Sequence, residues 1–255
     1  MSGYKKFKGM YVREGLAVDK NMINDCLRYY TIFGSKHSLE DAVVMDWGMN
    51  IGGFGHILLD KPIKKYIGIE AHPDNYDVAK ANLGHDPRFT LINAAVTSER
   101  DLWGDPIESI ELHLTGSKQE YCSGTTNLKS ETAKNMRKYK ISVPAVQASE
   151  VMEEFQPTHF KCDIEGEEYR VFDSWDWKFP ESILEMAFEF HWQDKILTYE
   201  NGWRSKILEN NFEAISESLN YVKGDTHFTW KNSPAPYRNI WGIDCFYGKT
   251  ELHAS

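Results

Sequence analysis

A glycine-rich segment, DWGMNIGGFG (46–55), has the residue types of a ligand-binding turn. Glycines let the backbone turn tightly after a strand and approach a ligand closely. The amino terminus of a following helix favours an anionic group such as a phosphate or a carboxylate. The carboxylate of Asp46 can in addition accept a hydrogen bond from an ammonium group. Such a turn can also be purely structural, so it predicts a site only together with other residues.

A second acid follows roughly 20 residues after the turn, where Glu70 ends the apolar segment YIGIE. A carboxylate at this place can accept hydrogen bonds from both hydroxyls of a ribose. The turn and Glu70 together therefore predict an adenosine-containing ligand, without distinguishing a dinucleotide from other adenosine cofactors. The competing interpretation is a solvated acid at the end of a strand.

The segment KCDIEGEE (161–168) places further acids at the end of a later predicted strand. Because the carboxyl ends of the strands line the ligand crevice in open α/β sheets, we expect Asp163 and Glu165 beside the cofactor and the acceptor. Acidic side chains are also favoured at the start of a helix by its dipole. That alternative explains Glu167 and Glu168 better than it explains Asp163.

His191 ends a long apolar segment that begins at Ile183. Alternation along a strand puts His191 on the same face as Glu189. A histidine that faces the crevice is a candidate general base, because its pKa lies near neutral pH. A single histidine can also be structural, and this alternative stays open.

The elements that must position these residues alternate between strands and helices. The first half reads as strands at 43–45, 66–70 and 89–92, with helices at 54–59 and 73–83 between them. This β-α-β-α-β order predicts a parallel sheet with crossover helices. Asp19 is expected to cap a helix that carries Met22 and Phe33. Residues 96–147 are less regular, and we expect further strands at 110–114, 159–162, 183–191, 212–215 and 240–246, the last two as an antiparallel pair, and helices near 151–155 and 196–207.

Composition limits the classes of partner. The chain has 255 residues without a repeat or linker, which favours one domain, with a helical lead-in (1–40) and a Rossmann-like core (41–255). Its formal net charge of −9 disfavours nucleic acid as a partner. The four cysteines are far apart, so neither a disulfide framework nor a metal site is expected. No stretch approaches the roughly 18 apolar residues of a membrane span, and the absence of a secretory signal predicts a cytoplasmic location.

The chain resembles the FkbM family of S-adenosylmethionine (SAM)-dependent methyltransferases. Two departures from the family's usual motifs are Met49, where the turn normally has alanine, and Ala71, where proline normally follows the acid. Arg13-Glu14-Gly15 and Asp19 are similar to the family's lead-in. The resemblance is carried, in the family's order, by VVMDWGMNIGGFG (43–55), YIGIEAHPDNYDVAKANL (66–83), FTLINAAVTSERDL (89–102) and HFKCDIEGEEYRVF (159–172), with LEMAFEFH (184–191) as a later strand.

The resemblance implies a Rossmann-like class I methyltransferase fold of the α/β class, with a mostly parallel sheet, helices on both faces and an antiparallel carboxyl-terminal strand pair. It implies SAM as cofactor and O-methylation of a sugar, a glycan or another small hydroxylated acceptor. The candidate bases, in order of preference, are His191, Glu165 and Asp163. The residues expected at the cofactor are Asp46, Gly48, Asn50, Gly52, Glu70, Ala71, Asn93 and Asp163.

Two other functions remain open at this stage. An NAD-dependent oxidoreductase would use the same turn and Glu70, but it leaves residues 163–168 unexplained. A Rossmann-like domain that binds SAM without turnover is the non-enzymatic alternative. Amino methylation of DNA bases is disfavoured, because such enzymes usually carry an Asn/Asp-Pro-Pro-Tyr turn where this chain has CDIEG. We expect the acceptor to be selected by residues 96–147 and 221–239.

Overall fold

The computed structural model describes residues 3–100, 102–114, 124–125, 139–191, 204–210, 212–221 and 240–250. Its centre is a seven-stranded sheet with the order β12-β13-β11-β10-β3-β4-β5. Strands β11 to β5 pair in parallel, whereas β13 is antiparallel to both of its neighbours. This confirms the predicted α/β sheet with its antiparallel carboxyl-terminal pair. The bounds are β3 Val43–Trp47, β4 Lys65–Glu70, β5 Phe89–Asn93, β10 His159–Cys162, β11 Glu185–His191, β12 Phe212–Tyr221 and β13 Ile240–Lys249.

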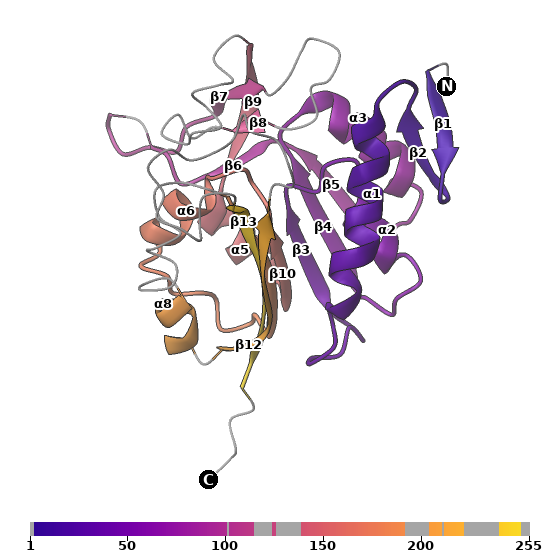
Figure 1. The fold of residues 1–255 in the computed structure, drawn as a ribbon. Helices are drawn as coiled ribbons and strands as arrows, with labels where there is room; N and C mark the ends of the chain where they lie inside the picture. Colours follow the sequence, from indigo (N-terminus) through magenta and orange to yellow (C-terminus); the bar gives the residue numbers. More distant parts are fainter. Residues whose placement is uncertain are drawn as a thin grey trace.

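Helices cover both faces of this sheet (Figure 1). Strand alternation separates the two cores, because neighbouring side chains point to opposite faces. Met45 and Phe160 belong to the core beneath α5 and α6, whereas Val44 and Tyr66 belong to the core beneath α2 and α3. One face carries α1 Ala17–Tyr29, α2 Gly53–Leu58 and α3 Pro73–Leu83, and the other carries α5 Ala148–Phe155, α6 Glu168–Ser174 and α8 Arg204–Glu209.

The register of the three central strands aligns the predicted site residues. Trp47 of β3 lies opposite Ile69 of β4 on one side and Cys162 of β10 on the other. The residues that come next in each chain segment are Gly48, Glu70 and Asp163. They therefore lie in one row at the carboxyl edge of the sheet, which is where ligands bind in open α/β sheets.

A smaller sheet lies above this edge, at the top of Figure 1. Its order is β6-β9-β7-β8, and it contains β6 Ala95–Thr97, β7 Ser109–Leu114, β8 Gly124–Thr125 and β9 Lys140–Gln147. The predicted strand at 110–114 is confirmed as β7, whereas the pairing of residues 95–97 with 145–147 was not predicted. A small core of Ala95, Leu112 and Val143, with Ala71 against it, joins this sheet to the end of β4.

The lead-in differs from the predicted helical segment. A hairpin of β1 Tyr4–Phe7 and β2 Met10–Arg13 precedes α1, and a short 3₁₀ turn, η1 Tyr30–Ile32, follows it. The prediction that Asp19 caps α1 is wrong. The helix begins at Ala17, and the carboxylate of Asp19 accepts hydrogen bonds from Arg13 instead of from the helix backbone.

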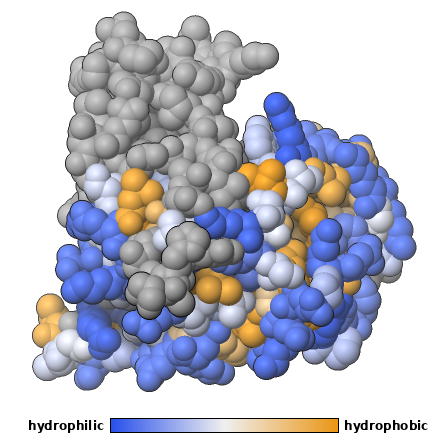
Figure 2. Space-filling model, turned by 90° about the horizontal axis from the view of Figure 1, so that it is seen from below, coloured by the Kyte–Doolittle hydropathy of each residue, from blue (hydrophilic) through white to orange (hydrophobic). Residues whose placement is uncertain are grey.

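The face at the amino ends of the parallel strands is seen from below in Figure 2. Hydrophilic residues dominate the described part of this face, and apolar residues occur there in small separate groups. Single exposed apolar residues are ordinary on protein surfaces. None of the helices in the described ranges is long and apolar enough to cross a membrane.

Candidate cofactor and acceptor site

A cavity lies at the carboxyl edge of the central sheet, beneath the smaller sheet. It is partly open to solvent, and its empty space of about 610 Å³ includes part of that solvent. Its lining comes from the turn after β3, the ends of β4 and β10, and the smaller sheet. The lining residues are Met22, Gly48, Asn50, Ile69, Glu70, Ala71, Ala94, Ala95, Val96, Leu112, Asp163, Ile164, Glu165 and Glu167.

The turn after β3 is fastened to β4 by backbone hydrogen bonds. The amides of Gly48 and Met49 both donate to the carbonyl of Ile69, at 2.9 and 3.1 Å. Gly48 has a φ of +76°, and a Cβ there would overlap the carbonyl oxygen of Asp163. Gly48 is thus required by the close approach of two protein segments. Gly52, with a φ of +88°, faces Leu83 of α3 and does not line the cavity.

Glu70 is held at the cavity by three donors. Its carboxylate accepts from the backbone amides of Asn50 and His72, each at 2.9 Å, and from the side-chain amide of Asn75 at 3.4 Å. Burial raises the pKa of Glu70 to about 7, and these hydrogen bonds oppose the rise. A carboxylate has about four acceptor positions, so Glu70 keeps capacity for a ligand hydroxyl.

Asp46 lies below the turn, outside the cavity lining. One of its oxygens accepts from Lys161 Nζ at 3.0 Å and the other from the Tyr66 hydroxyl at 2.5 Å. Lys161 also donates to the carbonyl of Gly48 at 3.1 Å and lies 3.6 Å from a carboxylate oxygen of Asp163. Burial by itself would lower the pKa of Lys161, but the two carboxylates outweigh burial and raise it. Lys161 is therefore a buried cation that joins β3 to β10.

The segment after β10 divides its acids between two tasks. Asp163 and Glu165 line the cavity, and Glu165 has an unusual φ of +56° for a residue with a side chain. Glu168 accepts from the backbone amide of Ile164 at 2.8 Å, and Glu167 accepts from the hydroxyl of Thr97 at 3.0 Å. Glu167 and Glu168 thus hold the segment in place beside the cavity, and Glu167 also forms part of the lining.

Three other residues were predicted to belong to the site, and each has a different position in the structure. The side-chain amide of Asn93 donates to the carbonyls of Glu70 and Ala71, at 2.8 and 3.3 Å, so it supports the end of β4 without lining the cavity. Ala71 does line the cavity. His191 is the last residue of β11 and pairs with Gly242 of β13, but its side chain lies outside the described part of the structure.

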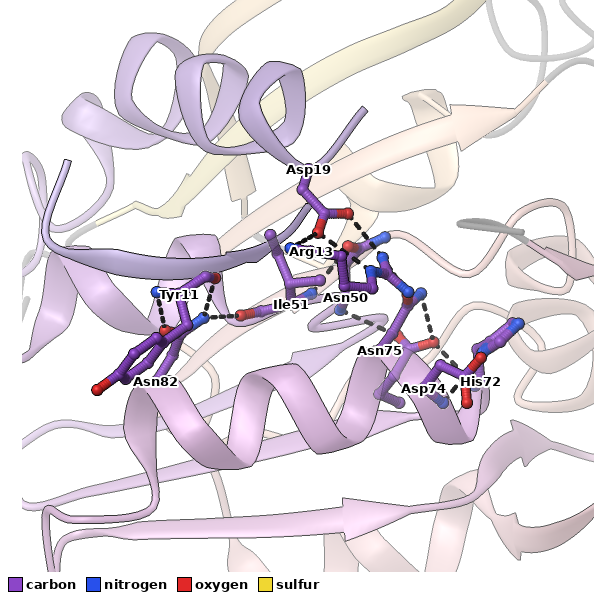
Figure 3. A network of polar contacts seen from close by, with 10 residues as sticks. Tyr11, Arg13, Asp19, Asn50, Ile51, His72, Asp74, Asn75 and Asn82 are labelled. Atoms are coloured by element: carbon purple, nitrogen blue, oxygen red, sulfur yellow. Dashed lines mark hydrogen bonds and ion pairs between the residues drawn. The ribbon is translucent and has the colours of Figure 1, made fainter. Parts of the chain in front are cut away.

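Sequence reasoning missed several contributors to this site. Met22 of α1 and Leu112 of β7 line the cavity, although both were expected only as members of a helix and a strand. Lys161 was noted as part of the KCDIEGEE segment without a role. Asn75 donates to Glu70 and itself accepts from Arg13 (Figure 3), and neither contact is visible in the pattern of the sequence around these residues.

The antiparallel strand β13, inserted between the parallel strands β11 and β12, distinguishes this sheet from a wholly parallel dinucleotide-binding sheet. Together with the glycine turn and Glu70 at the carboxyl edge of the sheet, this strand order agrees with the Rossmann-like class I methyltransferase fold that the sequence predicts. The family model described as "Methyltransferase FkbM domain" matches residues 46–214, and the chain belongs to this family. The family uses SAM, so the chain is a SAM-dependent methyltransferase. This decides against the NAD-dependent oxidoreductase.

Solved structures of other methyltransferases are similar to this chain at low identity. TYW2 from M. jannaschii in complex with AdoMet has 15% identity and a TM-score of 0.44, with 97% of this chain and 86% of that chain covered. A putative RNA methyltransferase, PH1948 from Pyrococcus horikoshii, has 12% identity and a TM-score of 0.43, with 94% of this chain and 87% of that chain covered. Precorrin-6y C5,15-methyltransferase from Geobacter metallireducens GS-15 has 10% identity and a TM-score of 0.47, with 94% of each chain covered. Such likeness carries no conclusion about the acceptor. No curated protein matches the chain.

Proposed function

We propose that this chain transfers a methyl group from SAM to a hydroxyl of a small hydroxylated acceptor such as a sugar or a glycan. The observation that carries the proposal is the cavity that brings Glu70 together with the acids after β10, Asp163 and Glu165. In this proposal the part of the cavity beside Glu70 holds the adenosine, and the carboxylate of Glu165 faces the acceptor.

Of the lining residues, Gly48, Asn50, Glu70 and Ala71 would hold the cofactor, and Asp163 would lie between cofactor and acceptor. Glu70 would accept hydrogen bonds from the ribose hydroxyls, because its buried carboxylate is already oriented by backbone donors. The carboxylates of the lining also favour a ligand that bears a positive charge. SAM, when bound, supplies a methyl group activated by a positively charged sulfonium.

Asp46, Gly52 and Asn93 would act behind the lining. Asp46 holds Lys161 under the turn, Gly52 lets α2 pack against α3, and Asn93 supports the end of β4. In this proposal their contribution to cofactor binding is to shape the turn and the position of Glu70. The proposal therefore replaces the expected contact between Asp46 and an ammonium group by an indirect role.

The acceptor end must remove a proton, because an alcohol is a weak nucleophile until it is deprotonated. Lys161 does not serve as this base, because its raised pKa keeps it protonated. His191 at the end of β11 is the first candidate, and the carboxylate of Glu165 in the cavity wall is the second. Asp163 is assigned mainly to the cofactor.

The test is incubation of the chain with SAM labelled on its methyl group and a panel of sugars and oligosaccharides. Amines and nucleosides serve as comparison acceptors, and NMR of the product locates the label. The proposal expects label on a sugar oxygen. Label found only on nitrogen or carbon would contradict O-methylation while leaving SAM-dependent methylation intact.

A further inference from the structure

The amino-terminal hairpin is joined to the glycine turn through one buried amide (Figure 3). The backbone amide of Tyr11 donates to Asn82 Oδ1 at 2.6 Å, and Asn82 Nδ2 donates back to the carbonyl of Tyr11 at 3.2 Å. The same Nδ2 donates to the carbonyl of Ile51 in the turn at 2.9 Å. Asn82 of α3 thus binds the hairpin as a neighbouring strand would, and it links the hairpin to the turn.

A small apolar core lies behind this connection. The side chains of Met10 and Val12 from β2 pack with Ile23 of α1, Ile51 of the turn and Val78 of α3, and all five are buried. Removing these side chains from water favours one position of the hairpin against α3. The residue that follows Val12 is therefore brought to a defined place.

That residue is Arg13, and its guanidinium is held by Asp19 of α1. Nη2 lies 2.7 Å and Nε 3.1 Å from the carboxylate oxygens of Asp19, which also accept from the backbone amide of Arg13 at 2.8 Å. Asp19 is 1% exposed, and hydrogen bonds between charged groups in such surroundings are short and strong. From this position Nη2 donates to Asn75 Oδ1 at 2.9 Å.

The contact with Arg13 determines how Asn75 faces Glu70. A guanidinium can only donate hydrogen bonds, so it binds the oxygen end of the Asn75 amide. The amino end is thereby turned to the carboxylate of Glu70, where Nδ2 donates to Oε1 at 3.4 Å. With the opposite orientation, two oxygens would face each other and Glu70 would lose a donor.

We propose that Arg13 is a positioning residue of the cofactor site, which acts through Asn75 to hold the Glu70 carboxylate in the orientation that receives the ribose. Asp19 holds Arg13 in turn. The hairpin then belongs to the cofactor site although it precedes the family domain at residues 46–214. This inference rests on the proposed role of Glu70.

The test is a double-mutant cycle on SAM affinity, measured by calorimetry on the full chain. The single variants are Arg13→Met, which keeps the aliphatic stem, and Glu70→Ala, and they are combined in a double variant. The loss of a supporting hydrogen bond to a charged group predicts about tenfold weaker SAM binding in Arg13→Met. In the Glu70→Ala background the same substitution should cause no further loss.

Two further variants serve as controls. Arg88→Met removes another arginine paired with an aspartate, Asp86, away from the site, and it should leave SAM affinity unchanged. Asn75→Ala breaks the same connection on α3 with a residue that favours helix. It should weaken SAM binding as much as Arg13→Met does, and it keeps the test available if Arg13→Met folds poorly.

The possible failures are distinguishable. If Glu70→Ala binds SAM normally, the proposed role of Glu70 fails, and the inference fails with it. If Glu70→Ala weakens binding but Arg13→Met and Asn75→Ala do not, only the inference is overturned. An equal loss from Arg13→Met in both backgrounds would also overturn it, because the hairpin would then act independently of Glu70.

Discussion

The buried carboxylate of Glu70 predicts a specific dependence of stability on pH. The pKa of glutamate is usually 4.5, and burial raises that of Glu70 to about 7. Each unit of pKa difference corresponds to about 1.4 kcal/mol. Keeping Glu70 ionised in the folded protein at pH 8 therefore costs roughly 3 kcal/mol.

The sign follows from where the proton is bound. The folded state holds the proton of Glu70 more tightly than the unfolded state does. The contribution of Glu70 to stability is therefore fully present below about pH 4.5 and is lost as the pH rises through about 7. Glu70→Gln cannot ionise and lacks this dependence, although its amide changes the hydrogen bonds at every pH.

The assay is urea unfolding of both proteins without ligand at pH 5 and pH 8. Between these values the free energy of unfolding of the wild type should fall by about 2–3 kcal/mol more than that of Glu70→Gln, which is less than the full cost because the glutamate of the unfolded chain is already mostly ionised at pH 5. Parallel changes in the two proteins would contradict this expectation, since Glu70 would then titrate as an exposed acid does.

Three more predictions follow from the site. Gly48→Ala should lower the Tm as well as SAM affinity, because its Cβ would overlap the Asp163 carbonyl. The control is Gly104→Ala, which has a similar positive φ but no atom within 4 Å of the added Cβ, and it should lower the Tm less. Equal Tm changes in the two variants would contradict the overlap. Lys161→Met should destabilise the fold by about 3–5 kcal/mol in urea unfolding, because Asp46 keeps a buried charge, and adding Asp46→Leu should recover part of the loss; no recovery would contradict this. His191→Ala should reduce turnover by ~10²–10⁴-fold with little change in SAM affinity; near-normal turnover combined with collapse in Glu165→Gln would assign the base to Glu165.

The sequence predicted the part of the site that depends on strand order. Gly48 and Asp163 each follow an apolar strand and Glu70 ends one, and parallel strands bring their carboxyl ends to one edge. Once the strands are known, their proximity follows without knowledge of side-chain packing. Their register in the structure agrees, with Trp47 paired to Ile69 and Cys162.

The remainder depends on contacts between distant segments. Arg13 and Asn75 are 62 positions apart, and Lys161 and Asp46 are 115 apart. The prediction that Asp19 caps a helix is wrong because an aspartate near the start of a helix can either cap it or bind a cation. Only the position of the Arg13 guanidinium in the structure decides between these two roles. In the smaller sheet only β7 was predicted, since β6 pairs with a strand about fifty residues away and has only three residues of its own.

In the proposed site, SAM binds at the carboxyl edge of the sheet with its ribose on Glu70. The most direct measurement is a calorimetric titration of the wild type and Glu70→Ala with SAM. A hydrogen-bonded charged acceptor contributes about 1.5–3 kcal/mol, so the variant should bind SAM roughly 10- to 150-fold more weakly while its circular dichroism spectrum stays that of the wild type. Equal affinity in a folded Glu70→Ala variant would contradict the claim and place the cofactor elsewhere.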